Sequence, residues 1–261
     1  MRIRLYQVDA FADRVFAGNP AAVCPLEAWL PEDTLQAIAF ENNLSETAFF
    51  VPEGDHWHLR WFTPQVEVQL CGHATLASAY VLFERLGEAR DAIVFRTRSG
   101  PLTVTRDGDQ FALDLPANVA EPTEAMPELA EALGRDPEFV LATPDHYLAV
   151  YGDAGAVAAL EPDMAAVRRL DRAGVIVTAR GGNDADFVSR YFAPQKGIDE
   201  DPVTGSAHCV LAPYWAARLG AAQLRARQIS RRGGALTCAL EGDRVTLRGA
   251  AVLYLEGEIS L

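Results

Sequence analysis

Three polar side chains stand beside two glycines, and each glycine begins an apolar segment of the chain. His73 directly follows Gly72, whereas Asp201 lies four residues before Gly205 and Ser206 directly follows it. An imidazole near one segment and a carboxylate near the other suit a base and an acid that move a proton at a carbon next to a carbonyl. The alternative is that the histidine only caps a helix.

Glu46 is a further candidate for proton transfer. It stands in "ENNLSETAFFVP", between a predicted helix that ends near Asn42 and a predicted strand that begins at Thr47. Its neighbours on the strand side are small or apolar, so we expect its carboxylate to be partly removed from water, as suits a general base or proton shuttle. The alternative is that Ser-Glu-Thr forms an ordinary turn between the helix and the strand.

An internal repeat relates these candidates to one another. "RWFTPQ" begins at Arg60, and "RYFAPQ" begins 130 residues later at Arg190. Further along, Gly72 stands opposite Gly205, an offset of 133 residues, so the second copy has gained three residues in the acidic run "IDEDP". Both apolar segments then end in "RLG". We interpret the two halves as the products of a duplication.

Each copy of the repeat predicts a strand, a loop and a buried helix. The stretches before the loop are rich in aromatic and branched residues, as in strands, and the segments after it are apolar almost all round, as in enclosed helices. We therefore predict an α+β fold of two pseudo-symmetric domains, each a curled, mostly antiparallel sheet or barrel around one central helix. The predicted domains are residues 1–116 and 117–249, with a last strand at about 250–261 that packs onto the first domain and an active site in the cleft between domains.

The starts of the two central helices predict how a ligand is held. The first N–H groups of a helix have no partner within it and lie at the positive end of its dipole, so they bind anions. Gly72 and Gly205 leave room for a ligand beside the backbone. We expect the two starts to bind one small molecule with a carboxylate or a developing enolate, since ligand sites favour domain interfaces. The alternative is that the glycines only permit tight packing.

Composition excludes several classes of protein. The chain has 261 residues, of which 49% are hydrophobic and 23% charged, as in a globular protein. It has no apolar run near the roughly 20 residues that span a bilayer, and its first residues lack the apolar core of a secretory signal, so we expect a cytoplasmic protein without a membrane partner. A net charge of -13 argues against a nucleic-acid partner.

The sequence gives no support for a metal or an organic cofactor. Its four cysteines are scattered and form no CxxC pair. His56 and His58 share one face of a predicted strand, but zinc needs three or four converging ligands. Neither the glycine pattern of dinucleotide-binding proteins nor the phosphate-binding loop occurs. We expect that the protein uses no cofactor and no metal.

Six motifs, in the same order, resemble those of the PhzF-like proteins, the phenazine-biosynthesis isomerase family. The resemblance implies the fold of diaminopimelate epimerase, a homodimer, and catalysis without a metal or an organic cofactor. The motifs lie between Asp9 and Trp215 and read "DAFADRVFAGNPAAVC", "NLSETAFF", "RWFTP", "CGHATLA", "RYFAP" and "DPVTGSAHC".

The resemblance also implies roles for individual residues. Glu46 matches the glutamate that acts as the acid and base in the family, where a proton moves within dihydro-hydroxyanthranilate. His73 and Asp201 match residues that bind and polarise the substrate and take part in catalysis. The positions expected to bind a small carboxylate-bearing substrate are Gly72, His73, Gly205 and Ser206.

A difference between the two copies bears on the type of reaction. The related epimerases and proline racemases use one cysteine in each repeat, whereas this chain has Cys71 in the first copy and Thr204 in the second. A threonine hydroxyl is too weak an acid to replace a thiol near neutral pH, which disfavours a two-thiol racemase. Three functions stay open: an isomerase that uses Glu46, an epimerase or racemase that uses Cys71 with a non-thiol partner, and a small-molecule-binding protein without catalysis.

Overall fold

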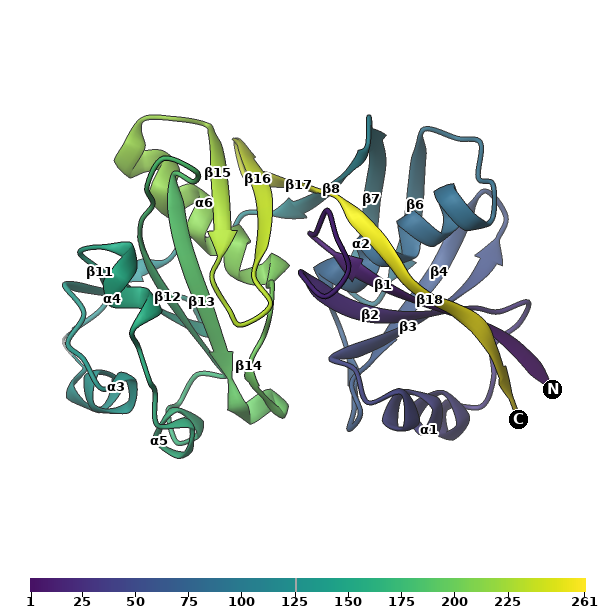
Figure 1. Cartoon of the computed structure of the whole chain (residues 1–261), viewed down its shortest axis with the longest axis horizontal. Helices are drawn as coiled ribbons and strands as arrows, with labels where there is room; N and C mark the ends of the chain where they lie inside the picture. Colours follow the sequence, from purple (N-terminus) through teal and green to yellow (C-terminus); the bar gives the residue numbers. More distant parts are fainter. Residues whose placement is uncertain (125) are drawn as a thin grey trace. The chain divides into compact units, whose positions relative to one another are not determined.

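The chain folds into two compact units, shown in a computed structural model that describes residues 1–124 and 126–261. Unit 1 consists of Met1–Leu115 and Thr246–Leu261, and unit 2 consists of Pro116–Val245. The colours of Figure 1 follow the chain through unit 1, then unit 2, and back to unit 1 at its end. Two strands, β8 (Gln110–Pro116) and β17 (Arg244–Gly249), contain the two points where the chain passes from one unit to the other.

Unit 1 contains a curled sheet in which parallel and antiparallel pairs alternate. β1 pairs antiparallel with β2, β2 parallel with β3, β3 antiparallel with β4, β4 parallel with β6, and β6 antiparallel with β7. The bounds of these strands are β1 (Arg2–Ala10), β2 (Asn19–Pro25), β3 (Glu46–Glu53), β4 (His56–Phe62), β5 (Glu67–Val68), β6 (Ala92–Thr97) and β7 (Gly100–Asp107).

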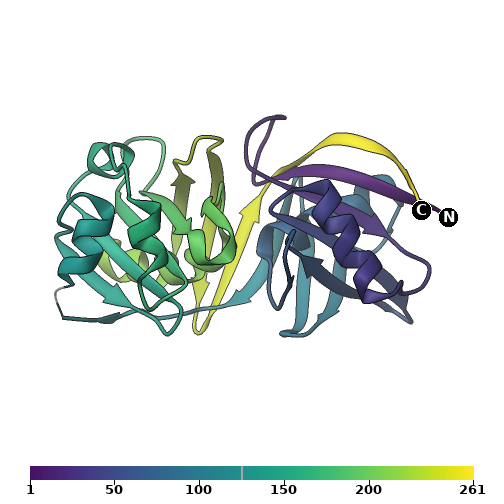
Figure 2. The ribbon, with the colours of Figure 1, turned by 90° about the horizontal axis from the view of Figure 1, so that it is seen from below.

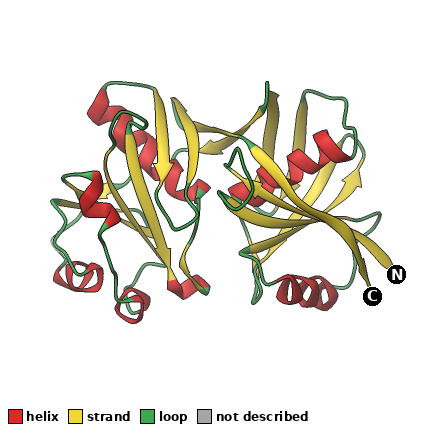
Figure 3. Ribbon diagram, viewed as in Figure 1, coloured by secondary structure: helices red, strands yellow, loops and turns green. Residues whose placement is uncertain are grey.

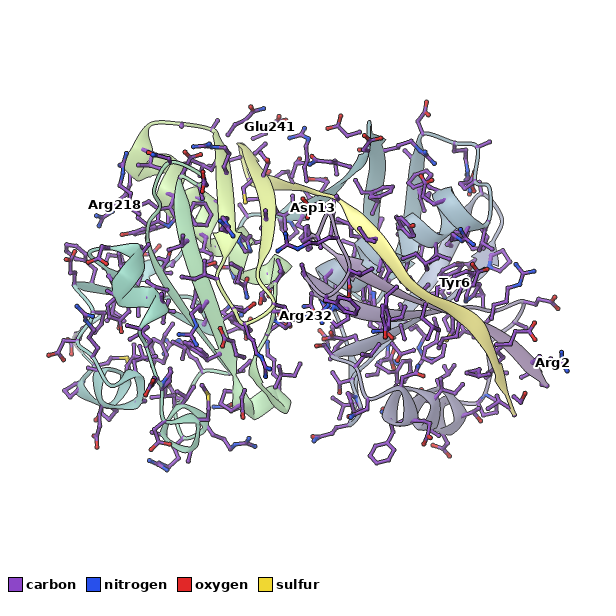
Figure 4. The ribbon with its side chains drawn as sticks, viewed as in Figure 1. Arg2, Tyr6, Asp13, Arg218, Arg232 and Glu241 are labelled. Carbon is purple, nitrogen blue, oxygen red and sulfur yellow. The ribbon has the colours of Figure 1, made fainter. Side chains whose placement is uncertain are left out.

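The last strand of the chain completes the sheet of unit 1. β18 (Ala251–Ser260) runs antiparallel to β1, from Arg2 opposite Ser260 to Ala10 opposite Ala251. The two termini therefore lie side by side, as Figures 1 and 2 both show. Tyr6 of β1, labelled in Figure 4, is fully buried.

A buried helix lies inside the sheet of unit 1. In α2 (Gly72–Tyr80) every residue except Tyr80 is buried, and the helix continues into a π-helical turn, η1 (Val81–Arg85). The segment is apolar almost all round, so only a sheet that curls around it can remove it from water. By contrast, α1 (Glu32–Asn42) lies on the outside of the unit and buries one face (Figure 2).

Unit 2 repeats this arrangement of strands. β10 pairs antiparallel with β11, β11 parallel with β12, β12 antiparallel with β13, β13 parallel with β15, and β15 antiparallel with β16. This is the order of pairings found in unit 1. The bounds are β9 (Glu121–Pro122), β10 (Phe139–Ala142), β11 (His146–Tyr151), β12 (Gly174–Arg180), β13 (Phe187–Ala193), β14 (Ile198–Glu200), β15 (Gln223–Gln228) and β16 (Gly234–Glu241).

The central helix of unit 2 is buried over its first half. In α6 (Gly205–Leu219), most residues from Gly205 to Ala212 are buried, whereas the last turn with Arg218, labelled in Figure 4, is exposed. Figure 3 shows this helix beside the strands and the smaller helices at the margin of the unit. The remaining helices are α3 (Pro127–Leu133), α4 (Ala154–Ala158), α5 (Met164–Arg168) and the 3-10 turn η2 (Pro194–Lys196). The predicted α+β fold, with a curled sheet and a central helix in each half, is confirmed.

An ion pair recurs at the same place in both repeats. In unit 1 the Arg60 guanidinium donates two hydrogen bonds of 2.7 Å to the carboxylate of Glu67. In unit 2 Arg190 donates two, of 2.7 and 3.0 Å, to Glu200. Each pair ties the strand before the loop to the short strand that leads to the central helix, with the two-pronged geometry that makes arginine–carboxylate pairs strong. The repeated arginine therefore fixes the approach to the helix.

A serine fastens the loop before each central helix. The Ser99 hydroxyl donates to the carbonyl of Gln69, and the Ser230 hydroxyl donates to the carbonyl of Pro202, both at 2.8 Å. Each carbonyl belongs to the residue three positions before the first glycine of the helix, so the contact is the same in both units. The internal repeat in the sequence does not reveal this contact, because both serines lie in hairpins outside the repeated stretches.

None of the helices in the described ranges is long and apolar enough to cross a bilayer.

The ion pair in unit 2 predicts a loss of stability when its arginine is removed. Replacing Arg190 by Met leaves the half-buried Glu200 carboxylate without its partner, and it also removes donors to the carbonyls of Val157 and Leu160. We expect the free energy of unfolding, measured by urea denaturation and circular dichroism, to fall by about 2 kcal/mol.

The control is Arg225→Met, which breaks the more exposed ion pair with Asp186. This variant should lose less than about 1 kcal/mol. Equal losses in the two variants would show that the repeated pair has no special structural role.

Candidate active site

Glu46, His73, Cys71 and Asn19 meet within unit 1. Glu46 is the first residue of β3, and its Cα partner on β2 is Ala21. Asn19 is the first residue of β2, two positions away from Ala21. Cys71 is the N-cap residue of α2, and His73 is the second residue of that helix. The parallel pairing of β2 and β3 therefore places an amide and a carboxylate at the start of the buried helix.

His73 is at the centre of this group. Its Nε2 lies 3.2 Å from Oε2 of Glu46. On the other side of the ring, Nδ1 lies 3.1 Å from the Nδ2 amide nitrogen of Asn19 and 3.5 Å from Sγ of Cys71. Both nitrogens of the imidazole thus have polar neighbours, and the ring links the carboxylate to the amide and the thiol.

Burial determines the charge of His73. Its residue is 4% exposed, and burial lowers the pKa of the imidazole to about 3. The ring is therefore neutral at pH 7 and carries one proton. Glu46 is less enclosed, with 13% of its side chain exposed. A carboxylate next to a neutral imidazole and partly open to solvent can take up and return a proton without first breaking a charged pair.

Glu46, Cys71 and His73 also bring together atoms of the kinds that bind metals. Among the described residues, Glu46, Cys71 and His73 each offer one donor atom, and these atoms lie within 4.8 Å of one another. Zinc would require one imidazole nitrogen to face the metal together with a thiolate and a carboxylate. Here Nε2 faces Glu46, whereas Nδ1 faces Asn19 and Cys71. The ring bridges its neighbours, an arrangement that suits proton handling better than coordination.

A second polar group lies at the start of α6 in unit 2. The Thr204 hydroxyl donates to Oδ2 of Asp201 at 2.5 Å. Gln228 joins the two residues, because its Oε1 accepts from the Thr204 N–H at 2.9 Å and its Nε2 donates to the Asp201 carbonyl at 2.6 Å. Asp201, Thr204 and Gln228 are all buried, whereas Ser206 is half-buried. The network fixes the acidic loop against the helix that follows it.

The two helix starts have the same type of N-cap. Cys71 and Thr204 both have extended backbone, with φ of -144° and -114°. In the part of the chain that the structure describes, neither side chain makes a capping hydrogen bond. Side-chain caps normally occupy the first amides of a helix. Both starts therefore keep the character of an anion site.

The structure brings together some of the residues predicted from the sequence. Glu46 and His73, 27 residues apart in the chain, are in contact. Asp201, Gly205 and Ser206 lie together at the start of α6 in unit 2.

Sequence reasoning missed two residues of these groups. Asn19 stands within the motif "FAGNPAAVC" but has no role in the sequence analysis. No motif or repeat in the sequence indicates a role for Gln228. Both reach their partners only through strand pairing.

Three buried histidines predict how stability depends on pH. Burial lowers the pKa of His73 to about 3 and the pKa values of His146 and His208 to about 4. In the unfolded chain a histidine titrates near pH 6.5. Between about pH 6.5 and pH 4 the unfolded state therefore binds more protons, so stability is complete above this window and falls as the pH drops through it.

His208→Gln tests this prediction, because Gln cannot titrate and can still donate to the Thr204 carbonyl that His208 contacts at 2.7 Å. We expect the fall in unfolding free energy from pH 6 to pH 5 to be smaller in this variant by about 1 kcal/mol. Urea denaturation at the two pH values measures it. The same pH dependence in variant and wild type would contradict a neutral, buried His208.

Comparison with known proteins places the chain among its relatives. The model of the PhzC-PhzF family, described as phenazine biosynthesis-like protein, matches residues 8–257. A Pseudomonas aeruginosa protein named as an uncharacterized isomerase is 55% identical over 261 residues, which cover 100% of both chains. The crystal structure of a PhzF-family phenazine biosynthesis protein from Enterococcus faecalis has a TM-score of 0.97 at 49% identity and likewise covers 100% of both chains.

The fold is also found in more distant proteins. A hydroxyproline epimerase from Agrobacterium vitis shares it with a TM-score of 0.64, over 100% of this chain and 93% of that one, at 12% identity. This likeness concerns the fold alone and confirms the predicted epimerase-like fold. Because the family match and the identity to relatives both extend over nearly the whole length, the chain belongs to the PhzC-PhzF family of phenazine biosynthesis-like proteins.

Proposed function

We propose that the protein is a cofactor-independent isomerase that moves a proton on a small carboxylate-bearing substrate, with Glu46 as the general base and general acid. The observation that carries this proposal is the contact of the Glu46 carboxylate with the neutral ring of His73 at the start of a buried helix. The isomerase names of close relatives support the class of reaction.

The proposed reaction needs only one proton carrier. The Glu46 carboxylate removes a proton from a carbon next to a carbonyl or carboxyl group, and the electron pair left on carbon becomes an enolate. In a substrate with a carbon–carbon double bond beside that carbon, the negative charge is shared with the far end of the double bond. The carboxylic acid so formed returns the proton to that far carbon, and the double bond moves by one position. His73, which is neutral, orients the Glu46 carboxylate through its N–H, and a hydrogen bond from this N–H to the developing enolate oxygen lowers the barrier.

Residues of unit 2 belong to the same proposal. We assign Asp201 to proton transfer together with Glu46 and His73, and Ser206 to substrate binding, as their motif positions imply. Gly72 and Gly205, each the first residue of a central helix, supply backbone amides for the carboxylate of the substrate. The proposal also includes a homodimer, as the family resemblance implies, and a place in the cytoplasm, as the composition predicts. Light scattering coupled to size-exclusion chromatography tests the dimer.

The role of Glu46 is tested by proton exchange in D2O. Cyclic and amino-acid carboxylates are first screened for binding by thermal shift, and the bound compounds are then followed by NMR for exchange of a carbon-bound proton. We expect Glu46→Gln to bind the same compounds but to lose exchange by at least about 100-fold, since removal of a general base typically costs that much.

The matched control is Glu53→Gln, at the exposed far end of the same strand. It should exchange at the rate of the wild-type protein. Undiminished exchange in Glu46→Gln would remove Glu46 from the mechanism. Compounds that bind without exchange in the wild-type protein would instead favour a small-molecule-binding protein without catalysis.

A second candidate function follows from Cys71. Its Sγ lies 3.5 Å from Nδ1 of His73, the distance at which an imidazole could take up the thiol proton. An epimerase or racemase would use this thiolate together with a non-thiol acid on the opposite face of the substrate carbon.

Cys71→Ser separates the two functions. For an isomerase that uses Glu46, we expect exchange to stay within about threefold of wild type, because a hydroxyl can occupy the space of the thiol. Loss of exchange by about 100-fold, together with inversion at the exchanging carbon in the wild-type protein, would establish the epimerase instead.

A further inference from the structure

We propose that Asn19 is a positioning residue that holds His73 in the tautomer with its proton on Nε2, and so gives the acid/base role to Glu46 rather than to Cys71. The second part of this statement rests on the proposed function. The first part concerns only the position of one proton in the folded protein.

The amide of Asn19 determines what Nδ1 of His73 can do. Nδ2 of Asn19 lies 3.1 Å from Nδ1, and both residues are buried, at 0% and 4% exposure. A side-chain NH2 group only donates hydrogen bonds, so the ring nitrogen opposite it has to be the acceptor. A neutral imidazole has one N–H, and its proton must therefore lie on Nε2.

The contact on the other side of the ring favours the same tautomer. Nε2 lies 3.2 Å from Oε2 of Glu46, and a carboxylate only accepts hydrogen bonds. With the proton on Nδ1, two donors would face each other at Asn19 and two acceptors would face each other at Glu46. Both mismatches would be buried, where unsatisfied polar groups cost most.

The position of the proton on His73 also affects Cys71. Its Sγ lies 3.5 Å from Nδ1, the nitrogen to which Asn19 donates. A thiolate at this position would be stabilised by an Nδ1–H, as in cysteine–histidine pairs that make nucleophiles. Because the Asn19 amide donates to the lone pair of Nδ1, this nitrogen is not available to take up the Cys71 thiol proton, and the N–H of the ring is directed towards Glu46.

The loop before Asn19 has a strained backbone. Between β1 and β2, Phe11 and Phe16 have positive φ, at 59° and 70°, which is uncommon for aromatic residues. Gly18 has φ of 65°, and a Cβ there would lie 2.2 Å from the Ala10 carbonyl oxygen. The buried carboxylate of Asp9 accepts the Phe16 N–H at 2.9 Å and holds the turn. Strain of this kind is typical of functional sites, and here the strained loop ends directly before Asn19.

The position of the proton can be measured by NMR. Protein labelled with 15N in its histidines is examined at pH 7 through the long-range couplings of the ring nitrogens, and the His73 signals are assigned by their loss in His73→Gln. We expect a protonated Nε2 and an unprotonated Nδ1 in the wild-type protein. A proton on Nδ1, or a doubly protonated ring, would overturn the proposal without use of any substrate.

Asn19→Asp replaces the hydrogen-bond donor opposite Nδ1 by an acceptor, in a side chain of nearly the same shape. A carboxylate accepts hydrogen bonds, so we expect Nδ1 of His73 to become protonated in this variant. Where a compound that exchanges its proton has been found, we expect kcat for exchange to fall at least tenfold with little change in KM. An unprotonated Nδ1 in folded Asn19→Asp would contradict the role of Asn19.

The control is Asn42→Asp, which adds the same charge beside Thr47, the residue after Glu46, where the Asn42 amide donates to the Thr47 hydroxyl. It should leave the His73 tautomer unchanged, and a shift of the proton in this variant would show that charge alone moves it. If the wild-type tautomer is as expected but no bound compound exchanges, the proposed function fails and the positioning of His73 stands.

Discussion

A helix that is apolar almost all round has to be surrounded, and α2 is such a helix, with each residue from Gly72 to Ala79 buried. The curled sheet of unit 1 follows from this requirement, because a flat sheet covers only one face of a helix. The polar groups at the helix start are enclosed as well and need partners. For His73 enclosure gives a neutral ring, and the ring in turn requires a donor on one side and an acceptor on the other. Nδ2 of Asn19 lies 3.1 Å from Nδ1 of the ring, and Oε2 of Glu46 lies 3.2 Å from its Nε2.

The duplication explains which parts of the two units are alike. The alternation of strand pairs, the arginine–carboxylate pair and the serine bound to the loop carbonyl occur in both. All three determine how the chain reaches the start of a central helix. Both starts have a carboxylate and an amide, but the other side chains differ, with an imidazole and a thiol in unit 1 and a hydroxyl in unit 2. The two units have kept the same strands and supporting contacts, whereas the reactive side chains at the helix starts have diverged.

The fold could be predicted from the sequence because the features that indicate it are local or repeated. The apolar helices, the motif at Arg60 and Arg190, and the glycines that follow can be read along the chain. The family motifs implied roles for Glu46 and His73, but the contact between them is known only from the structure. The role of Asn19 was out of reach, because it depends on the pairing of β2 with β1 and β3 and on a loop with positive φ. Gln228 likewise reaches Thr204 only because β15 pairs in parallel with β13.

In the proposed function, Glu46 is the group that takes the proton from the substrate. The most direct measurement is a crystal structure of the Glu46→Gln variant with a bound compound whose proton the wild-type protein exchanges. The claim predicts that the exchanging carbon lies within about 3.5 Å of the side-chain amide at position 46, as in a near-attack geometry. A carbon that lies against Sγ of Cys71 instead, out of reach of position 46, would contradict it.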